Sequence, residues 1–385
     1  MTEYDFKLVD DLIKQDASCG FPGAVLHVSL RGKTIKHSAY GYKSRWGRTF
    51  ESLIAPEPME NDTVFDLASN TKIFATTLSI LKLVSEKLLN IDKEVKFYLP
   101  EFIHQDVTVR MLLSHSSGLG PEIWYFDPKN SLGKEFYSQE REKTKQLLLK
   151  TPLGYEPGKA SLYSDTGFML LGSVVEIVTG MELDKATGEL IYKPLGLKNT
   201  CFNPIKTNHI AATSIGNTCN GTMDYPNIRK DVIRGEVQDE KAFYCMDGVA
   251  GHAGLFSNSS EVIKMCDLIQ EIYHYGGQDS FFSREKLLDF ITTKGSDEIF
   301  TCGWRVNRAH KVSNLFGEMA PELTIGHSGF TGTLSLMDLQ NHLSIVLLTN
   351  KVHSFCYDRK HYAGSDFPTG KYAPVIDKVY KSLEL

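Results

Sequence analysis

Segments that resemble β-strands lie near both ends of the chain, and this arrangement limits the folds available to it. Near the start, residues 24–30 and 34–42 flank an Arg-Gly-Lys turn, which predicts a β-hairpin. Near the end, residues 334–337 and 343–348 predict a second hairpin. Apolar helical segments, broken by Pro and Gly, fill the stretch between them. We therefore predict an α/β (α+β) fold in which both chain ends build one antiparallel sheet flanked by helices, with a mostly helical domain inserted.

The length of the chain fits two units of this kind. Domains usually hold about 100–200 residues, and this chain has 385, of which 42% are hydrophobic. We place the sheet domain at residues 1–98 and 255–385 and the helical domain at residues 99–254. Amphipathic repeats predict helices at residues 3–16 and 374–384.

The charge and the distribution of apolar residues exclude several classes of partner. The formal net charge is −5, and no long run of Lys or Arg is available to bind phosphate backbones, so we expect no nucleic-acid partner. No stretch reaches the roughly 18 apolar residues of a membrane-spanning helix. The first residues lack the basic start and apolar core of a secretory signal, which predicts a cytoplasmic protein.

Neither the cysteines nor the histidines predict a metal or cofactor site. The seven cysteines are scattered, odd in number and without a C-x-x-C pair, so we expect reduced, mostly buried thiols rather than disulfides or zinc ligands. The 12 histidines are dispersed and form no H-E-x-x-H motif, so we expect no metal and no cofactor. The cysteines are Cys19, Cys201, Cys219, Cys245, Cys266, Cys302 and Cys356.

Ser69 and Lys72 form an S-x-x-K pair at the start of a strongly apolar helix predicted over residues 71–89. Residues three apart share a helix face, so the two side chains can meet. The first N–H groups of a helix are unpaired and partly positive, so they can stabilise a developing oxyanion. We also expect burial to lower the pKa of Lys72, which would let it act as a base.

The S-x-x-K spacing alone does not select this pair. Ser79 falls inside the predicted helix, beyond its free N–H groups, whereas Ser131 and Ser283 stand in polar surroundings that predict exposure. A serine that caps a helix, followed by an exposed lysine, gives the same spacing. Ser69 alone combines a helix start, a buried lysine and apolar flanks. The three competing pairs are Ser79–Lys82, Ser131–Lys134 and Ser283–Lys286.

Tyr163 opens a second segment, Tyr163-Ser164-Asp165, directly before an apolar helix predicted over residues 167–178. A tyrosine there can project its phenol oxygen into a cleft, where a facing Lys72 would favour the phenolate and make it a usable base. The alternative is a core tyrosine whose hydroxyl is bonded locally.

A glycine-rich segment, residues 326–333, precedes the last predicted hairpin. Its small residues, Gly329 among them, allow a ligand to approach the backbone closely. His327 and Ser328 would offer hydrogen bonds to a substrate, and the N–H of Phe330 would be a second oxyanion donor. The alternative is an ordinary glycine-rich turn.

In this order and at this wide spacing, the three segments resemble the S-x-x-K, Y-S-x and [K/H]-[S/T]-G motifs of class C β-lactamases and their relatives. The relatives include penicillin-binding D-Ala-D-Ala carboxypeptidases, D-aminopeptidases and esterases. Residues 112–119, 194–197 and 248–257 also resemble segments of that family, so the resemblance runs from about residue 20 to residue 353. It implies a β-lactamase/transpeptidase-like fold and an acyl-enzyme on the serine of the first motif.

Two residues depart from the class C pattern. Asp165 stands where those β-lactamases have Asn, and an ionised Asp only accepts hydrogen bonds. His327 stands where they have Lys. Both changes remove donor or positive character from the place of a β-lactam carboxylate, so we expect a pocket that prefers neutral or cationic groups.

We therefore predict a serine hydrolase in which Ser69 attacks an ester or amide carbonyl after Lys72 and Tyr163 take its proton. Small esters, amides and peptides are the expected substrates, and the alternative is a β-lactamase or a D-Ala-D-Ala carboxypeptidase. A penicillin-binding sensor or scaffold without turnover is the alternative from another class. His115 and His252 are expected to fix loops through backbone hydrogen bonds. The residues expected to bind the substrate and its oxyanion are Asp165, His327, Ser328, Gly329 and Phe330.

Overall fold

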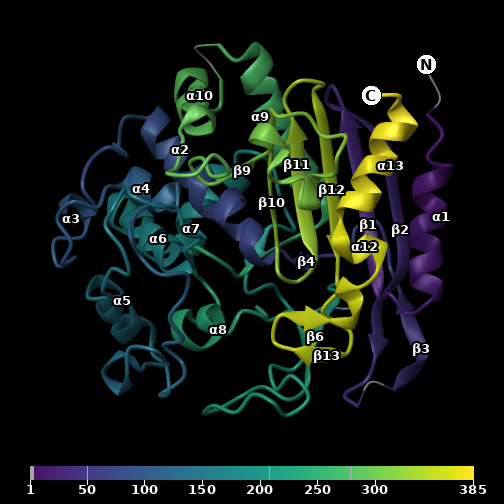
Figure 1. Ribbon diagram of the computed structural model, residues 1–385, viewed down its shortest axis with the longest axis horizontal. Helices are drawn as coiled ribbons and strands as arrows, with labels where there is room; N and C mark the ends of the chain where they lie inside the picture. The colour runs from purple at the N-terminus through teal and green to yellow at the C-terminus, as the bar shows by residue number, and fades with distance from the viewer. Residues whose placement is uncertain (1–3, 50, 208, 278–279) are drawn as a thin grey trace.

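The computed structural model describes residues 4–49, 51–207, 209–277 and 280–385 (Figure 1). Within them, seven strands form one antiparallel sheet in the order β3-β2-β1-β12-β11-β10-β9. The sheet contains strands from both ends of the chain, which confirms the predicted fold class. The strands are β1 Gly23–Leu30, β2 Lys33–Trp46, β3 Ser52–Pro58, β9 Arg305–Val306, β10 Thr324–Ser328, β11 Thr333–Asp338 and β12 Leu343–Thr349.

The antiparallel pairing of β1 with β12 joins the two ends of the chain. Both strands are apolar almost throughout, because both faces of the sheet are covered by helices. Side chains alternate between the faces. The paired residues Leu26 and Leu347 therefore enter one hydrophobic core, whereas the next pair, Val25 and Leu348, enters the other.

Two helices from opposite ends of the chain cover one face of the sheet (Figure 1). They are α1 Lys7–Ser18 and α13 Ala373–Leu383, and Ile13 and Val379 are among the residues they bury in the smaller core. Both correspond to predicted helices, although α1 begins and ends later than predicted. Residue 3, the predicted start of the first helix, lies outside the described residues.

The larger core lies on the opposite face of the sheet. Helix α9 Ser259–Tyr275 packs against β1, β11 and β12 there. Beyond it, α2 Leu78–Ser85 and α6 Asp165–Thr179 add apolar side chains to the same core. The predicted helix over residues 167–178 is confirmed by α6, and its apolar composition follows from this burial.

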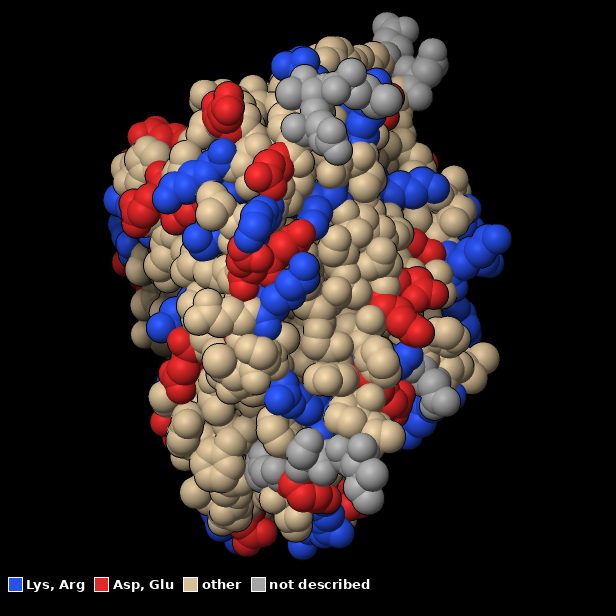
Figure 2. Space-filling view, turned by 90° about the vertical axis from the view of Figure 1, so that its right-hand side faces the viewer, with Lys and Arg blue, Asp and Glu red and all other residues tan. Residues whose placement is uncertain are grey.

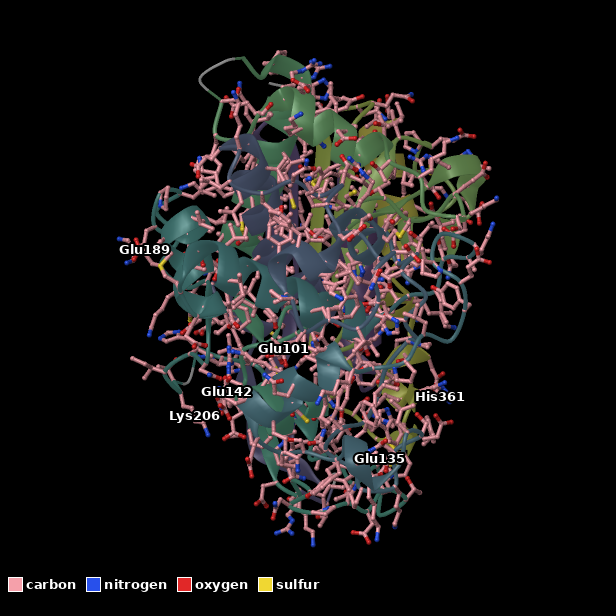
Figure 3. The ribbon with its side chains drawn as sticks, turned by 90° about the vertical axis from the view of Figure 1, so that its left-hand side faces the viewer. Glu101, Glu135, Glu142, Glu189, Lys206 and His361 are labelled. Atoms are coloured by element: carbon pink, nitrogen blue, oxygen red, sulfur yellow. A yellow bond between two sulfur atoms is a disulfide. The ribbon has the colours of Figure 1, made fainter. Side chains whose placement is uncertain are left out.

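Several of the helices outside these layers belong to the segment predicted as an inserted helical domain, and the exact domain limits stay a prediction. Figure 3 shows this side of the molecule, where Glu142 and Glu189 lie exposed at the surface. The elements of the segment at residues 99–254 are α4 Val109–Leu113, α5 Arg141–Leu149, α6, α7 Leu183–Thr187, α8 Glu240–Met246, β5 Cys201–Phe202, β6 Ala212–Ile215 and β7 Val232–Arg234. The remaining elements are α3 Val95–Tyr98, α10 Arg284–Thr292, α11 Ser313–Phe316, α12 Pro368–Lys371, β4 Phe65–Asp66, β8 Leu255–Ser257, β13 Cys356–Asp358 and β14 His361–Tyr362.

The surface over α1 and α13 mixes both signs of charge, with Lys and Arg lying among Asp and Glu (Figure 2). Among the described residues, no single helix has the length and apolar composition needed to span a membrane. Helix α6 and the segment Leu183–Tyr192 meet those criteria only as a pair, and the pair is bent by 72°.

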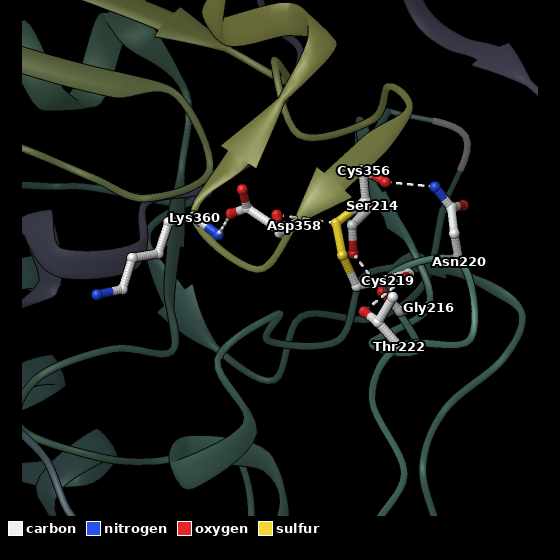
Figure 4. Close-up of a disulfide and its surroundings, with 8 residues drawn as sticks. All are labelled: Ser214, Gly216, Cys219, Asn220, Thr222, Cys356, Asp358 and Lys360. Atoms are coloured by element: carbon white, nitrogen blue, oxygen red, sulfur yellow. Dashed lines mark hydrogen bonds between the residues drawn. A yellow bond between two sulfur atoms is a disulfide. The ribbon is translucent and has the colours of Figure 1, made fainter.

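A disulfide between Cys219 and Cys356 corrects the prediction that the cysteines are reduced (Figure 4). It joins the inserted segment to β13 across 137 residues of sequence. The side chain of Asn220 also donates a hydrogen bond to the carbonyl of Cys356. Sequence spacing does not encode a pairing this remote, because the fold alone brings the two segments together. The thiols of Cys19, Cys201, Cys245, Cys266 and Cys302 are free, and the last three are buried.

Loss of this disulfide should destabilise the protein. Disulfides typically contribute about 2–4 kcal/mol to stability, and the contribution is larger for longer loops. We expect Cys219→Ser/Cys356→Ser to lower the free energy of unfolding by about that amount in chemical denaturation, whereas Cys19→Ser, at an exposed free thiol, should leave it unchanged. Alkylation of both Cys219 and Cys356 in unreduced protein, located by peptide mapping, would refute the bond.

Candidate active site

Ser69 lies in a strained turn between a strand and a helix. After β4, the chain forms a 3-10 turn, Ala68–Asn70, and Ala68 adopts a left-handed conformation with φ of 46°. Such strain persists only where surrounding contacts hold it, and it concentrates at functional sites. Here the buried Asp66 carboxylate accepts hydrogen bonds from the N–H groups of Ala68, at 2.8 Å, and Gln238, at 2.7 Å. The side chain of Ser69 remains half-buried.

The predicted helix over residues 71–89 is shorter and less regular than expected. A π-helical segment spans Lys72–Thr77, and the α-helix α2 ends at Ser85. The wider π turns are uncommon and occur frequently at functional sites. The hydroxyl of Thr76 donates to the carbonyl of Gly251 at 2.7 Å, which attaches this segment to the chain before β8.

Lys72 meets Ser69 as the S-x-x-K spacing predicts. Its ammonium nitrogen lies 3.1 Å from the Ser69 Oγ and is completely buried. The same nitrogen donates to Asp165 Oδ1 at 2.7 Å and to the His252 carbonyl at 3.3 Å. Residues from three separate segments therefore surround one buried cation.

The pKa of Lys72 is raised, which corrects the prediction that burial lowers it. Burial does favour the neutral amine, but the negative charge of Asp165 and the Tyr163 hydroxyl together outweigh that effect. Lys72 is therefore an ammonium at neutral pH. In that state it donates a hydrogen bond to Ser69 and cannot accept the serine proton.

Tyr163 lies over this ammonium, with 4.7 Å between the ring centroid and Lys72 Nζ. Its neighbour Ser164 is the N-cap of α6 and accepts from the Gly167 N–H at 3.1 Å, which sets the direction of the chain here. His115 packs beside the tyrosine with 4.7 Å between ring centroids, and its Nδ1 accepts from the Ser164 N–H at 3.0 Å. The predicted loop-fixing role of His115 is confirmed by that backbone hydrogen bond.

The sequence pattern missed a second buried lysine, Lys241. Its ammonium lies 3.3 Å from Asp165 Oδ2, 2.8 Å from Glu122 Oε2 and 3.1 Å from Asp239 Oδ2. Burial alone would raise the pKa of Asp165, but Lys72 and Lys241 hold it well below its usual range. Lys241 stands in no motif, so only the fold reveals it.

Three of these residues have the composition of a metal site. Ligand atoms of Asp165, Asp239 and His252 lie within 4.8 Å of one another. His252 Nε2 is 2.9 Å from Asp239 Oδ1, while the Lys241 ammonium already contacts both carboxylates. A metal ion at this place would meet that buried positive charge, so the residues do not fit a metal site. A second group, Glu60, Asp62 and His209, is exposed at the surface.

The glycine-rich segment lies against the Ser69 turn. A Cβ atom at Gly329 would come within 2.5 Å of the Leu67 carbonyl, so only glycine allows this approach. The Thr331 hydroxyl donates to the Asp66 carbonyl at 2.8 Å, and the Thr333 hydroxyl donates to the Leu67 carbonyl at 3.0 Å. The turn between β10 and β11 is thus attached to the residues that precede the serine.

His327 is buried beside Tyr163, with 5.7 Å between ring centroids. Its Nδ1 donates to the Ser328 carbonyl at 2.7 Å, which leaves Nε2 as a buried acceptor without a partner among the described residues. Burial, Arg305 and Lys72 lower the pKa of His327 well below its usual value, so the ring is neutral. Phe330 is 43% exposed and packs against Tyr362.

Arg305 is a further residue that no motif indicated. It lies on β9 opposite Gly326 of β10, and its guanidinium is 5.4 Å from the Tyr163 ring centroid and 4.9 Å from that of Phe300. Its Nε is buried and has no hydrogen-bond partner within the described part of the chain. This charge restores positive character beside His327, where the sequence predicts its loss.

The competing S-x-x-K pairs have ordinary structural surroundings. Ser79 is buried inside α2, and Ser131 is exposed. Ser283 is the N-cap of α10 and accepts from the Lys286 N–H. The choice of Ser69 from its context agrees with this geometry.

Comparisons with known proteins show the family of the chain. The family model described as Beta-lactamase matches residues 9–365. A Bacillus subtilis (strain 168) protein named N-acetylmuramyl-L-alanine amidase is 42% identical, over 98% of this chain and 88% of its own. An Escherichia coli K12 protein named as a D-alanyl-D-alanine carboxypeptidase is 38% identical, over 98% of this chain and 90% of its own.

Solved structures share the fold at lower identity. EstCE1, a hydrolase with promiscuous acyltransferase activity, has a TM-score of 0.73 at 21% identity and covers 97% of this chain and 98% of its own. The penicillin-binding protein homologue from Pyrococcus abyssi has a TM-score of 0.68 at 22% identity and covers 98% of this chain and 77% of its own. The chain belongs to the β-lactamase family and is a serine hydrolase of that family.

Proposed function

We propose that Ser69 is the nucleophile of an acyl-transfer reaction on small amides and peptides. The observation that carries this proposal is the 3.1 Å contact between Ser69 Oγ and the buried Lys72 ammonium, next to the Tyr163 ring. The names of the relatives, an amidase and a carboxypeptidase, support an amide rather than an ester as the natural substrate.

In the proposed mechanism, Tyr163 acts as the general base that takes the proton of Ser69, because the protonated Lys72 cannot accept it. The Ser69 oxygen attacks the carbonyl carbon, and the N–H groups of Ser69 and Phe330 hold the oxyanion. The tyrosine then returns its proton to the leaving nitrogen as the C–N bond breaks. Water attacks the resulting ester, and its proton follows the same route back to Ser69.

We further propose that the substrate carries a carboxylate, which Arg305 binds. Strand β9 pairs with β10 only as far as Gly326. The edge of β10 from His327 onward can therefore pair with an extended substrate. The neutral His327 can accept a substrate N–H at Nε2, and Arg305 lies at the end of that edge. This proposal replaces the expectation of a neutral or cationic group, which rested on Asp165 and His327 alone.

The nucleophile can be tested by covalent labelling. Ser69→Ala should abolish labelling by a fluorophosphonate or a β-lactam probe, because the attacking oxygen is gone. Ser283→Ala is the matched control, since it alters an S-x-x-K serine that only caps a helix. Mass spectrometry should place the adduct of the unmodified protein on Ser69. An adduct on another serine would contradict the assignment, and an adduct without hydrolysis of any substrate would favour a sensor or scaffold.

The carboxylate site predicts a preference that one substitution removes. The unmodified enzyme should cleave a D-Ala-D-Ala peptide with a free carboxylate faster than its C-terminal amide. Arg305→Met should reduce kcat/KM for the free acid by about 10–100-fold, the range for a buried hydrogen bond to a charged group. The amide should be little affected. Arg48→Met, at an exposed arginine paired with Asp231, is the control. Equal loss for both substrates would argue against a carboxylate contact.

A further inference from the structure

Lys241 is an unusual residue to find inside the molecule. Its side chain is 3% exposed and contacts three carboxylates, those of Glu122, Asp165 and Asp239. A buried charge costs several kcal/mol unless partners compensate it, and pairs of this kind are often replaceable by apolar residues without loss of stability. Stability alone therefore does not account for a lysine at this position.

The contacts that link Lys241 to Lys72 indicate a role for Lys241 in the site. The two ammonium groups share the Asp165 carboxylate, with Lys72 on Oδ1 at 2.7 Å and Lys241 on Oδ2 at 3.3 Å. A second connection runs from Lys241 through Asp239 to the ring of His252, whose carbonyl accepts from Lys72. These contacts form a closed ring of five residues that includes Lys72.

The two lysines of this ring face its two aspartates, Asp165 and Asp239. The partly exposed Glu122 lies outside the ring and adds one negative charge next to Lys241. Removal of Lys241 would leave Lys72 as the remaining lysine in contact with Asp165 among the described residues. The electrostatic support that Lys72 gives to Ser69 and Tyr163 would fall accordingly.

We propose that Lys241 is a positioning residue for the Ser69 reaction, which neutralises one side of Asp165 so that Lys72 remains available to Ser69 and Tyr163. This inference rests on the proposed function. It requires that Asp165 and Lys241 act as a pair: each is harmful without the other, and removal of both restores the charge balance around Lys72.

Other charged and titratable groups face the same site. The pKa values of the buried His115 and His327 lie well below the usual value, through burial first and then through nearby cations, so both rings stay neutral. The Arg305 guanidinium lies 5.4 Å from the Tyr163 ring centroid. None of these contacts Lys241, so substitution there changes one charge selectively.

The test is a double-mutant cycle read as pH profiles of kcat/KM on a chromogenic amide. Lys241→Met removes a positive charge, which favours the protonated forms of the titrating groups in the site. Both limbs of the profile should therefore shift to higher pH by about one unit. Asp165→Asn removes a negative charge and should move both limbs down. In the double variant the two charge changes oppose each other, so its limbs should lie between those of the two single variants.

Two further measurements separate the proposal from a purely structural role. Lys241→Arg keeps the charge and should retain the original profile, and thermal unfolding of each variant identifies any that fails to fold. The proposal is overturned if Lys241→Met lowers the maximum of kcat/KM but leaves both limbs at the same pH. It is also overturned if the limbs of the double variant shift further than those of either single variant. Failure of the proposed function itself would appear separately, as amide hydrolysis that survives Ser69→Ala.

Discussion

The ion pair between Lys72 and Asp165 is the contact on which the arrangement of the site depends. It connects the turn after β4 to the first residue of α6, which belongs to the helical segment of the chain. Because both groups are largely removed from water, their attraction is weakly screened, and together with Tyr163 it outweighs the effect of burial on the pKa of the lysine. Lys72 consequently acts as a fixed positive charge, and the mechanism that we propose therefore assigns proton transfer to Tyr163.

The features that were predictable from the sequence are those with a local or periodic signal. Alternating and continuous apolar runs marked β1, β2, β11 and β12, and the sheet followed because such strands must bury their faces. Ser69 and Lys72 are three residues apart, so helical geometry alone brings them together. Tyr163 was found because it directly precedes a conspicuous apolar helix.

The features that escaped the sequence depend on contacts between distant segments. Lys241 and Arg305 carry no motif, and each reaches the site only through the packing of its helix or strand. The disulfide partners Cys219 and Cys356 are equally remote. For Lys72, the pattern predicted burial correctly but gave no information on the opposing charges, and for this reason the expected direction of its pKa shift was wrong.

The pairing of β1 with β12 has a consequence for biosynthesis. Strand β1 leaves the ribosome well before its partner β12, which lies more than 300 residues later. At typical rates of translation, β1 must wait on the order of tens of seconds with one edge unpaired. A contact of such long range also slows folding, since its loop entropy must be overcome before the pairing stabilises anything. The nascent chain is therefore a candidate client for chaperones that shield open strand edges.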